Sequence, residues 1–128
     1  MFKISSTKAL PVVLIALLLS PLAPVAAQEK TGMNRAVLLE KELQLPSPNI
    51  DAKVIRVTFP FGFKTPWHTH EGPGPRYVVK GQLKVVEGGK ENTYAAGDVF
   101  WETGALMSVE NVGDAEAELI IFELAPVK

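Results

Sequence analysis

The strongest constraint on the fold is a series of short segments rich in β-forming residues, separated by turns that contain glycine. Valine, isoleucine, phenylalanine and tyrosine favour strands, and glycine or proline ends each run. The sequence predicts strands over residues 53–59, 76–80, 82–87, 92–95, 98–102, 107–111 and 117–124. Gly88-Gly89, between two of these segments, is typical of a hairpin turn. Many short strands without a convincing long helix indicate an all-β sandwich or barrel.

The N-terminal region has the order of a secretory signal peptide. Lys3 and Lys8 precede an apolar run over residues 9–19, and small residues with prolines follow as far as Ala27. This order predicts a signal peptide over residues 1–27, cleavage after Ala27, and a secreted or periplasmic protein. The alternative is a retained transmembrane anchor. Since a bilayer core needs roughly 20 apolar residues, the short run predicts no stable anchor after cleavage.

Beyond the signal, we expect a flexible N-terminus at residues 28–34 and one barrel domain at residues 35–128. The whole chain has a net charge of −1 and contains no cysteine. A nucleic-acid partner is excluded because lysine and arginine do not cluster on a basic domain. The lack of cysteine excludes a disulfide framework and thiolate chemistry, so core packing alone must hold the exported domain together.

Residues 36–45 allow two interpretations. Leucine, glutamate, lysine and glutamine are good helix formers. However, Leu39, Leu43 and Leu45 alternate with polar residues, which is largely the period of a strand. Pro46-Ser-Pro-Asn49 closes the segment. We predict a strand.

His68 and His70 are the two histidines of the chain, and they lie together in the segment from Pro66 to Gly74. In an extended backbone, residues i and i+2 project to the same face. The two imidazoles can therefore aim at one point inside a barrel, where imidazole suits zinc, copper, iron and nickel. The alternative is a pair of ordinary surface histidines at the end of a strand.

With this context the sequence resembles the cupin superfamily, specifically small single-domain cupins with a type-2 conserved barrel. The first motif of that family is Gly, five residues, His-x-His, three or four residues, Glu, six residues, Gly. Four positions of this chain keep that spacing: Gly62, His68, His70 and Gly81. The second motif is similar to the stretch from Gly97-Asp98 to Asn111. The resemblance implies a jelly-roll-like double-stranded β-helix of about six to eight strands with a site in its mouth.

Two departures from the family concern its metal ligands. Gly74 stands where the family has its glutamate, and Met107 stands where it has its third histidine. Glu71, next to His70, can replace the glutamate only if the chain turns at Gly72. Met107 is either an apolar filler of the barrel or a soft ligand that would select copper, above all Cu(I).

Aromatic residues on the expected strands are further candidates for the pocket: Tyr77, Phe100 and Trp101. Neighbouring residues of a strand face opposite sides, so one of Phe100 and Trp101 lines the interior, and Arg76 and Tyr77 are split in the same way. The candidate metal ligands are His68, His70, Met107 and Glu71. They predict either one ion of copper, zinc, iron or manganese, or a pocket without a metal.

These residues predict an exported cupin that binds a small molecule or a metal ion around His68 and His70, without established catalysis. The alternative is a metal-dependent oxygenase or isomerase, as many cupins are. The barrel alone does not license an activity, and a catalytic metal usually has three protein ligands. Whether the protein is an enzyme is left open. By the same resemblance, residues 36–45 are the candidate contact of a homodimer.

Overall fold

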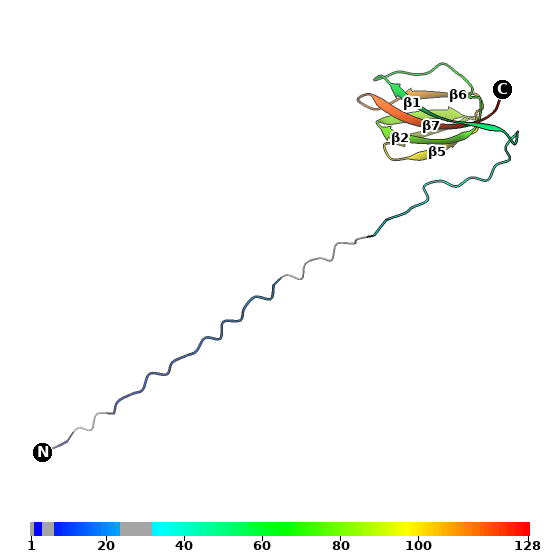
Figure 1. Cartoon of the computed structure of the whole chain (residues 1–128). Coiled ribbons are helices and arrows are strands. Elements are labelled where there is room, and N and C mark those ends of the chain that lie inside the picture. Colours follow the sequence, from blue (N-terminus) through cyan, green and yellow to red (C-terminus); the bar gives the residue numbers. More distant parts are fainter. Residues whose placement is uncertain (1, 4–6, 24–31) are drawn as a thin grey trace. The chain divides into compact units, whose positions relative to one another are not determined.

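The computed structural model describes residues 2–3, 7–23 and 32–128, and Figure 1 shows its course. The chain divides into two units, Met1–Asn34 and Arg35–Lys128, and the strands lie in the second unit. Among the described residues, no helix is long and apolar enough to cross a membrane. The expected cleavage site after Ala27 lies outside the described residues, so the signal peptide remains a prediction.

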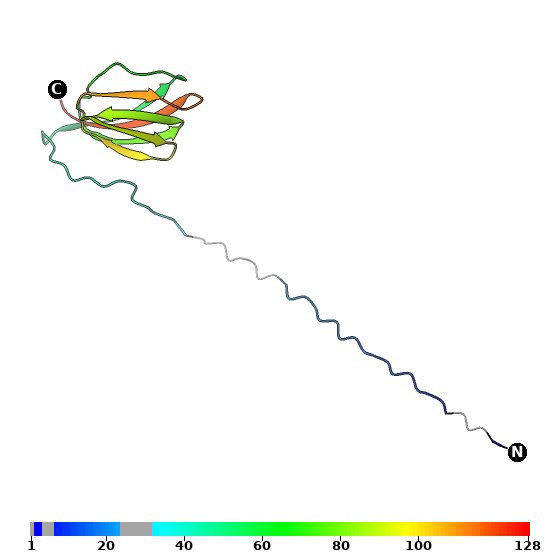
Figure 2. The same ribbon diagram turned by 180° about the vertical axis from the view of Figure 1, so that it is seen from behind.

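Seven strands form the second unit. They are β1 (Ile50–Phe59), β2 (Gly74–Lys80), β3 (Gln82–Glu87), β4 (Lys90–Ala95), β5 (Val99–Glu102), β6 (Met107–Asn111) and β7 (Ala117–Pro126). The four-stranded sheet has the order β1-β7-β2-β5, and the three-stranded sheet has the order β4-β3-β6. The four-stranded sheet faces the reader in Figure 1, and the view from behind in Figure 2 brings the three-stranded sheet forward. The predicted all-β class is confirmed, since residues 32–128 contain strands and no helix.

The strand predictions agree with the structure within a few residues, with one exception. Residues 36–45 form no strand, so that prediction is wrong. Alternating hydrophobicity is not sufficient for a strand, because the backbone also needs a neighbour that pairs with its N–H and C=O groups. No ladder joins this segment to β1 or β5, the edge strands of the larger sheet, in the described part of the chain.

The hairpin between β3 and β4 shows how local chemistry sets the register. Glu87 pairs with Lys90, so Gly88 and Gly89 alone form the turn. Both have positive φ angles, 58° and 73°. A two-residue hairpin of this kind needs φ above zero at both positions, which glycine adopts without steric cost. The hairpin prediction is confirmed.

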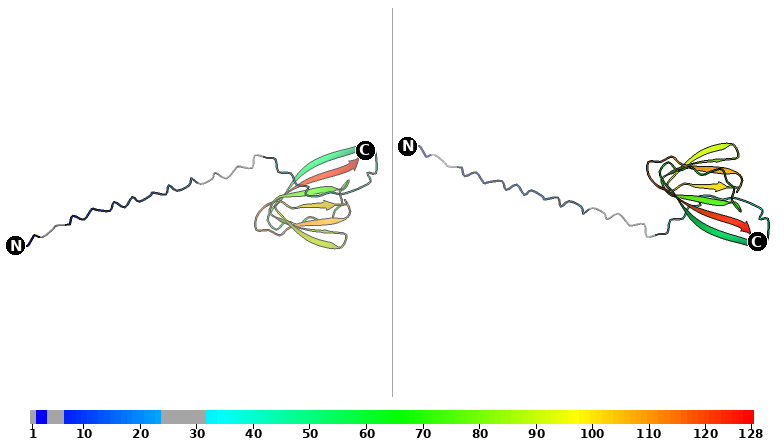
Figure 3. Two further views of the ribbon diagram at one scale, coloured as in Figure 1. Left: turned by 90° about the horizontal axis from the view of Figure 1, so that it is seen from below. Right: turned by 90° about the horizontal axis from the view of Figure 1, so that it is seen from above.

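The interior lies between the inward faces of the two sheets. Its apolar part consists of buried side chains from both: Phe59, Val78, Leu83, Val85, Phe100, Met107, Val109, Ala117, Leu119 and Ile121. β1 and β7 form the longest ladder, from Ile50–Pro126 to Phe59–Ala117, and they lie side by side in Figure 3. Alternation along β7 turns Leu119, Ile121 and Glu123 inward.

Buried polar side chains occur toward both ends of this interior. We call one the histidine end, made of His68, His70, Arg76, Glu102 and Glu123. We call the other the asparagine end, made of Asn111 and the backbone at Phe59, Pro60, Gly113 and Ala115. β6 runs from Met107, which pairs with His68, to Asn111.

Candidate functional site

The backbone of the histidine segment is fixed against the beginning of β6. His68 and Met107 exchange two backbone hydrogen bonds, of 3.0 and 2.8 Å, and the N–H of His70 donates to the carbonyl of Gly104 at 3.1 Å. The two imidazole rings lie together, with their centroids 5.1 Å apart and their planes at 69°. The segment therefore presents both rings to one region, as the i, i+2 spacing requires.

His68 is oriented by a backbone carbonyl. Its Nδ1 lies 2.8 Å from the carbonyl oxygen of Pro66. Because a carbonyl oxygen only accepts, Nδ1 must carry the hydrogen in this contact, and in a neutral ring Nε2 keeps its lone pair. The Nε2 atom can therefore accept a hydrogen bond from a ligand or bind a metal ion.

His70 lies between two buried carboxylates. Its Nδ1 is 3.2 Å from Oε2 of Glu123 on β7, and its Nε2 is 3.5 Å from Oε2 of Glu102 on β5. Glu102 and Glu123 are 1% and 4% exposed, whereas 16% of the His70 side chain reaches solvent. The His70 ring is thus the solvent-accessible member of this group of three side chains.

Arg76 on β2 is a further buried member of the cluster. It is fully buried, its Nε donates to Oε2 of Glu102 at 2.8 Å, and its Nη1 donates to the carbonyl of Phe122 at 2.6 Å. Its Nη2 is also buried and finds no partner among the described residues. A buried donor without an acceptor costs about 1–3 kcal/mol, and more when it is charged. This atom is the clearest unmet hydrogen-bonding demand of the histidine end.

Gly74 explains why the site takes a carboxylate from Glu102 on the neighbouring strand. A Cβ atom at this position would lie 1.8 Å from the carbonyl oxygen of Phe122, so no side chain fits there. Gly74 is paired with Glu102 in the β2–β5 ladder. Paired residues of an antiparallel ladder project to the same face. Glu102 therefore supplies, from the neighbouring strand, a carboxylate on the face where position 74 has none.

The structure does not bring Glu71 to the histidine pair. Its carboxylate contacts Nζ of Lys128 at 2.7 Å and Nζ of Lys53 at 2.8 Å, and 45% of its side chain is exposed. The hydrogen bonds from Lys128 and then Lys53 lower the pKa of Glu71 to about 2. This carboxylate is an ion-pair partner at the surface.

The remaining predicted pocket residues separate by the alternation of their strands. Phe100 is buried and stacks on Tyr94, with ring centroids 4.1 Å apart. Of the two alternatives on each strand, Arg76 and Phe100 are the buried ones, and Tyr77 and Trp101 occupy the opposite faces of β2 and β5. Tyr77 lines a groove of about 440 Å³ together with residues 35–39, and Arg76 and Phe122 also contribute to its lining. Met107 is fully buried in the apolar core, beside His68.

Two site residues were not predicted from the sequence as part of the site: Glu102 and Glu123. Arg76 was considered only as the alternative to Tyr77. A usable signal exists, because Glu102 is two residues from buried Phe100 on its strand, and alternation places such residues inward. Acidic and basic residues are almost never fully buried unless they are paired, so an inward position marks them as site candidates.

The described residues contain no group of three or more His, Asp or Glu side chains that could hold a metal ion. A physical cause is visible at Glu102. This carboxylate is the one beside Nε2 of His70, and it is already paired with the guanidinium of Arg76. The described His, Asp and Glu side chains therefore do not complete a metal site by themselves.

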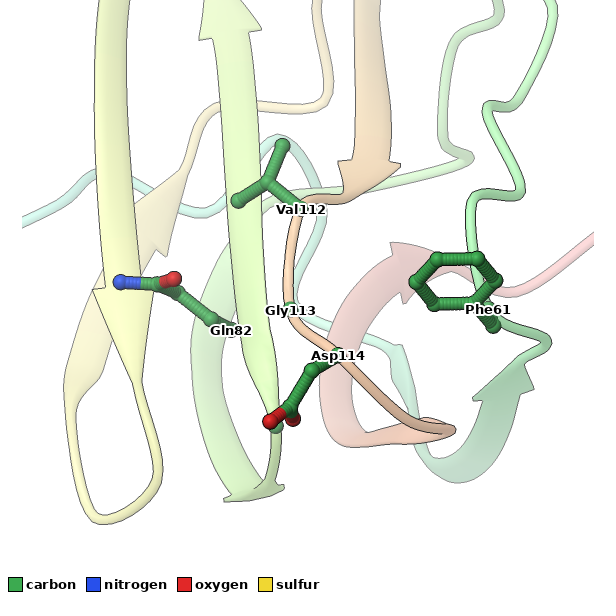
Figure 4. A pocket seen from close by; sticks show the side chains of 6 residues that line it. Phe61, Gln82, Val112, Gly113 and Asp114 are labelled. Carbon is green, nitrogen blue, oxygen red and sulfur yellow. The ribbon is translucent and has the colours of Figure 1, made fainter.

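A cavity of about 590 Å³ lies near the asparagine end. Figure 4 shows the side chains of Phe61, Gln82, Val112 and Asp114 around it. Neither histidine lines this cavity. It is thus separate from the cluster described above.

Residues 55–123 match the protein family described as the cupin domain, which is more than half of the chain. The chain belongs to the cupin family. A search of curated proteins returned no match. Membership supports a general role in binding a small ligand or a metal ion, and many cupins bind a transition metal.

Solved structures with TM-scores above 0.5 show that the chain has the cupin fold. A cupin with a double-stranded β-helix fold from Methanocaldococcus jannaschii shares 17% identity, with a TM-score of 0.52 over 74% of this chain and 94% of that chain. A cupin domain from Schizosaccharomyces pombe shares 21% identity, with a TM-score of 0.51 over 66% of this chain and 61% of that chain. A predicted oxalate decarboxylase from Thermotoga maritima shares 28% identity, with a TM-score of 0.49 over 58% and 65%. The chain spans less than two thirds of the last two proteins. The predicted cupin barrel is confirmed.

Proposed function

We propose that this cupin is exported and binds a small, uncharged molecule with hydroxyl groups at the histidine end, without a resident metal ion. The observation that carries the proposal is the buried Nη2 of Arg76, which lacks an acceptor among the described residues. A hydroxyl oxygen of a ligand would accept from it. The export part of the proposal is supported by the signal-like order of residues 1–27.

The other polar groups of the site are hydrogen-bond acceptors and need donors from a ligand. Glu102 and Glu123 are acceptor-only when ionised, and Nε2 of His68 is an acceptor in the neutral ring. A hydroxyl group both donates and accepts, so one molecule with several hydroxyls can serve Arg76 and the acceptors together. An apolar ligand would leave Nη2 of Arg76 without an acceptor, which is costly in a buried site.

The charge of the cluster favours an uncharged ligand over an anion. The carboxylates of Glu102 and Glu123 outnumber the guanidinium of Arg76, which is the permanent cation of the cluster, by one. A second anion would be repelled in a poorly solvated site, where charges are screened less than in water. We therefore expect neutral sugars and polyols to bind better than the corresponding acids.

The test is a titration of the metal-stripped protein with D-glucose, D-galactose and myo-inositol, and with D-gluconate as the charged counterpart. The side-chain NMR signal of Arg76 and the melting temperature report binding. We expect at least one neutral compound to shift both, and the exposed-site variant Lys90→Ala to behave as wild type. His70→Ala should weaken the response. No response to any neutral compound, or an equal response to gluconate, would contradict the proposal.

A metal ion held by His68 and His70 is the second candidate function. The hydrogen bond from Nδ1 of His68 to Pro66 favours it, because metal-bound histidines commonly donate their other ring nitrogen to a carbonyl or a carboxylate. Met107 would then be the third donor and would favour copper. Metal analysis of the protein purified without chelators decides: one equivalent of copper or zinc per chain supports this candidate.

A further inference from the structure

We infer that Arg76 is a built-in cation that balances the carboxylate of Glu102 and thereby keeps a divalent metal ion out of the barrel. The inference deepens the proposed function, since it rests on a metal-free site at the histidine end. Arg76 thus opposes metal binding in addition to the two missing ligands of the family, which Gly74 and Met107 replace.

The separation of Glu102 from His70 is that of two metal ligands, but the cation beside Glu102 is the guanidinium of Arg76. Oε2 of Glu102 and Nε2 of His70 are 3.5 Å apart. Two ligands of one ion, each about 2.1 Å from it, lie at roughly this separation. However, Oε2 of Glu102 is also 2.8 Å from Nε of Arg76, and both side chains are almost completely buried. The carboxylate that a metal ion would need is the one that the guanidinium uses.

Electrostatic repulsion follows from these distances. An ion bound to Oε2 of Glu102 at about 2.1 Å would lie within roughly 5 Å of Nε of Arg76. At that distance a divalent ion and a guanidinium repel strongly in a site screened less than water. Arg76 cannot relieve the repulsion by losing its proton, because arginine stays charged in proteins.

The arginine is also firmly held. Its Nη1 donates to the carbonyl of Phe122, and a Cβ atom at position 74 would lie 3.1 Å from that nitrogen. Gly74 therefore makes room for the guanidinium as well as for the close approach of β7. The departure that removes the glutamate of the cupin motif thus also accommodates a permanent positive charge.

The test compares Arg76→Met with Arg76→Lys by Zn²⁺ titration in competition with a chromophoric chelator. The two replacements have similar length and differ in charge. We expect Arg76→Met to bind one Zn²⁺ at least about ten-fold more tightly than wild type, the scale on which neighbours of a metal site act. Arg76→Lys should remain like wild type. The double variant Arg76→Met/Glu102→Gln should lose the gained affinity.

Equal Zn²⁺ affinity of wild type and Arg76→Met would overturn the inference, and so would tight one-to-one binding by wild type. If Arg76→Met does not fold alone, it is refolded with and without Zn²⁺, followed by circular dichroism. Recovery only with Zn²⁺ supports the inference, and failure in both conditions overturns it. The sugar and polyol titration is read separately, so a protein that binds no neutral ligand can still show the gain of metal affinity in Arg76→Met.

Discussion

The two ends of the barrel both bury polar side chains, yet they satisfy them differently. At the asparagine end, Nδ2 of Asn111 donates to the carbonyls of Phe59, Pro60 and Ala115 at 3.0, 3.1 and 2.8 Å. Its Oδ1 accepts from the N–H of Gly113 at 3.0 Å. The amide has used its hydrogen-bonding capacity on the backbone, and these contacts tie the β6–β7 turn to the end of β1.

At the histidine end, the hydrogen-bonding capacity of the buried groups is not fully used within the described residues. Arg76 is as deeply buried as Asn111, but its Nη2 has no acceptor among the described residues. The partners here are mostly side chains, His70 and Glu102 among them, and these can ionise or turn toward a ligand. The contrast separates two uses of buried polarity: a group fully bonded to backbone holds the fold, and a group left with spare donors or acceptors is available for binding.

The largest effect is expected from Asn111→Leu. The change removes the donor to the carbonyls of Phe59, Pro60 and Ala115 and the acceptor of the Gly113 N–H. The carbonyl of Pro60 still accepts from the N–H of Phe63, whereas the other groups lose this partner, so we expect a loss of about 4 kcal/mol in the free energy of unfolding. Chemical denaturation measures it, with Val112→Ala at a half-exposed neighbouring site as the control. Ligand binding by the fraction that stays folded should be unchanged. A loss below about 1 kcal/mol would mean that this network is not structural.

The next effect tests whether the two carboxylates of the histidine end are equivalent. Glu102→Gln leaves Arg76 buried without its counter-charge and should cost about 3 kcal/mol. Glu123→Gln keeps an oxygen acceptor for His70 and leaves the Arg76–Glu102 pair intact, so its cost should stay below about 1 kcal/mol. Equal losses in thermal or chemical unfolding would show that Arg76 does not depend on Glu102 alone.

Met107 lies between the apolar core and the histidine end, and its variants should show a smaller effect. Met107→Ala opens a cavity in a fully buried position, at a cost of about 2 kcal/mol. Met107→Leu keeps the volume and should cost less than about 1.5 kcal/mol. If Met107 only packs, Met107→Leu should also leave copper binding unchanged. A loss of Cu(I) affinity in Met107→Leu would instead identify the sulfur as a ligand.

The sequence predicted the fold well because its signals are local. Gly88-Gly89 fixes a two-residue turn, and the register of β3 with β4 follows from it. The interval from Gly62 to Gly81 carries the cupin spacing. The failure at residues 36–45 has the opposite origin, since pairing with a neighbouring strand is a tertiary property.

The site was predictable only in part, for the same reason. Spacing along the chain brings His68 and His70 together, but it says nothing of the strand beside them. Alternation along β5 marks Glu102 as a candidate inward residue, but only the register opposite Gly74 places it beside the histidines. Alternation separates Arg76 from Tyr77 without saying which one faces inward, and that choice depends on the packing of the whole sheet.

The smallest effect concerns Glu71, the carboxylate next to His70 in sequence that stays outside the site. Hydrogen bonds from Lys128 and Lys53 lower its pKa from 4.5 to about 2 in the folded protein. A group whose pKa is depressed on folding adds stability above its unfolded pKa and loses it as the pH falls through the folded value. Its contribution should therefore be complete above pH 4.5 and disappear between pH 4.5 and about pH 2.

Glu71→Gln tests this assignment together with the boundary of the histidine end. The stability difference between wild type and Glu71→Gln should be small, because both lysines and the carboxylate are solvent-exposed, and 1 M salt should reduce it further. The difference should shrink as the pH is lowered toward 2, as followed by urea denaturation at a series of pH values. Ligand and Zn²⁺ titrations of Glu71→Gln should match wild type. A pH-independent difference would show that Glu71 acts through packing. Altered ligand binding by Glu71→Gln would place Glu71 inside the site, because distant, independent positions do not change that affinity.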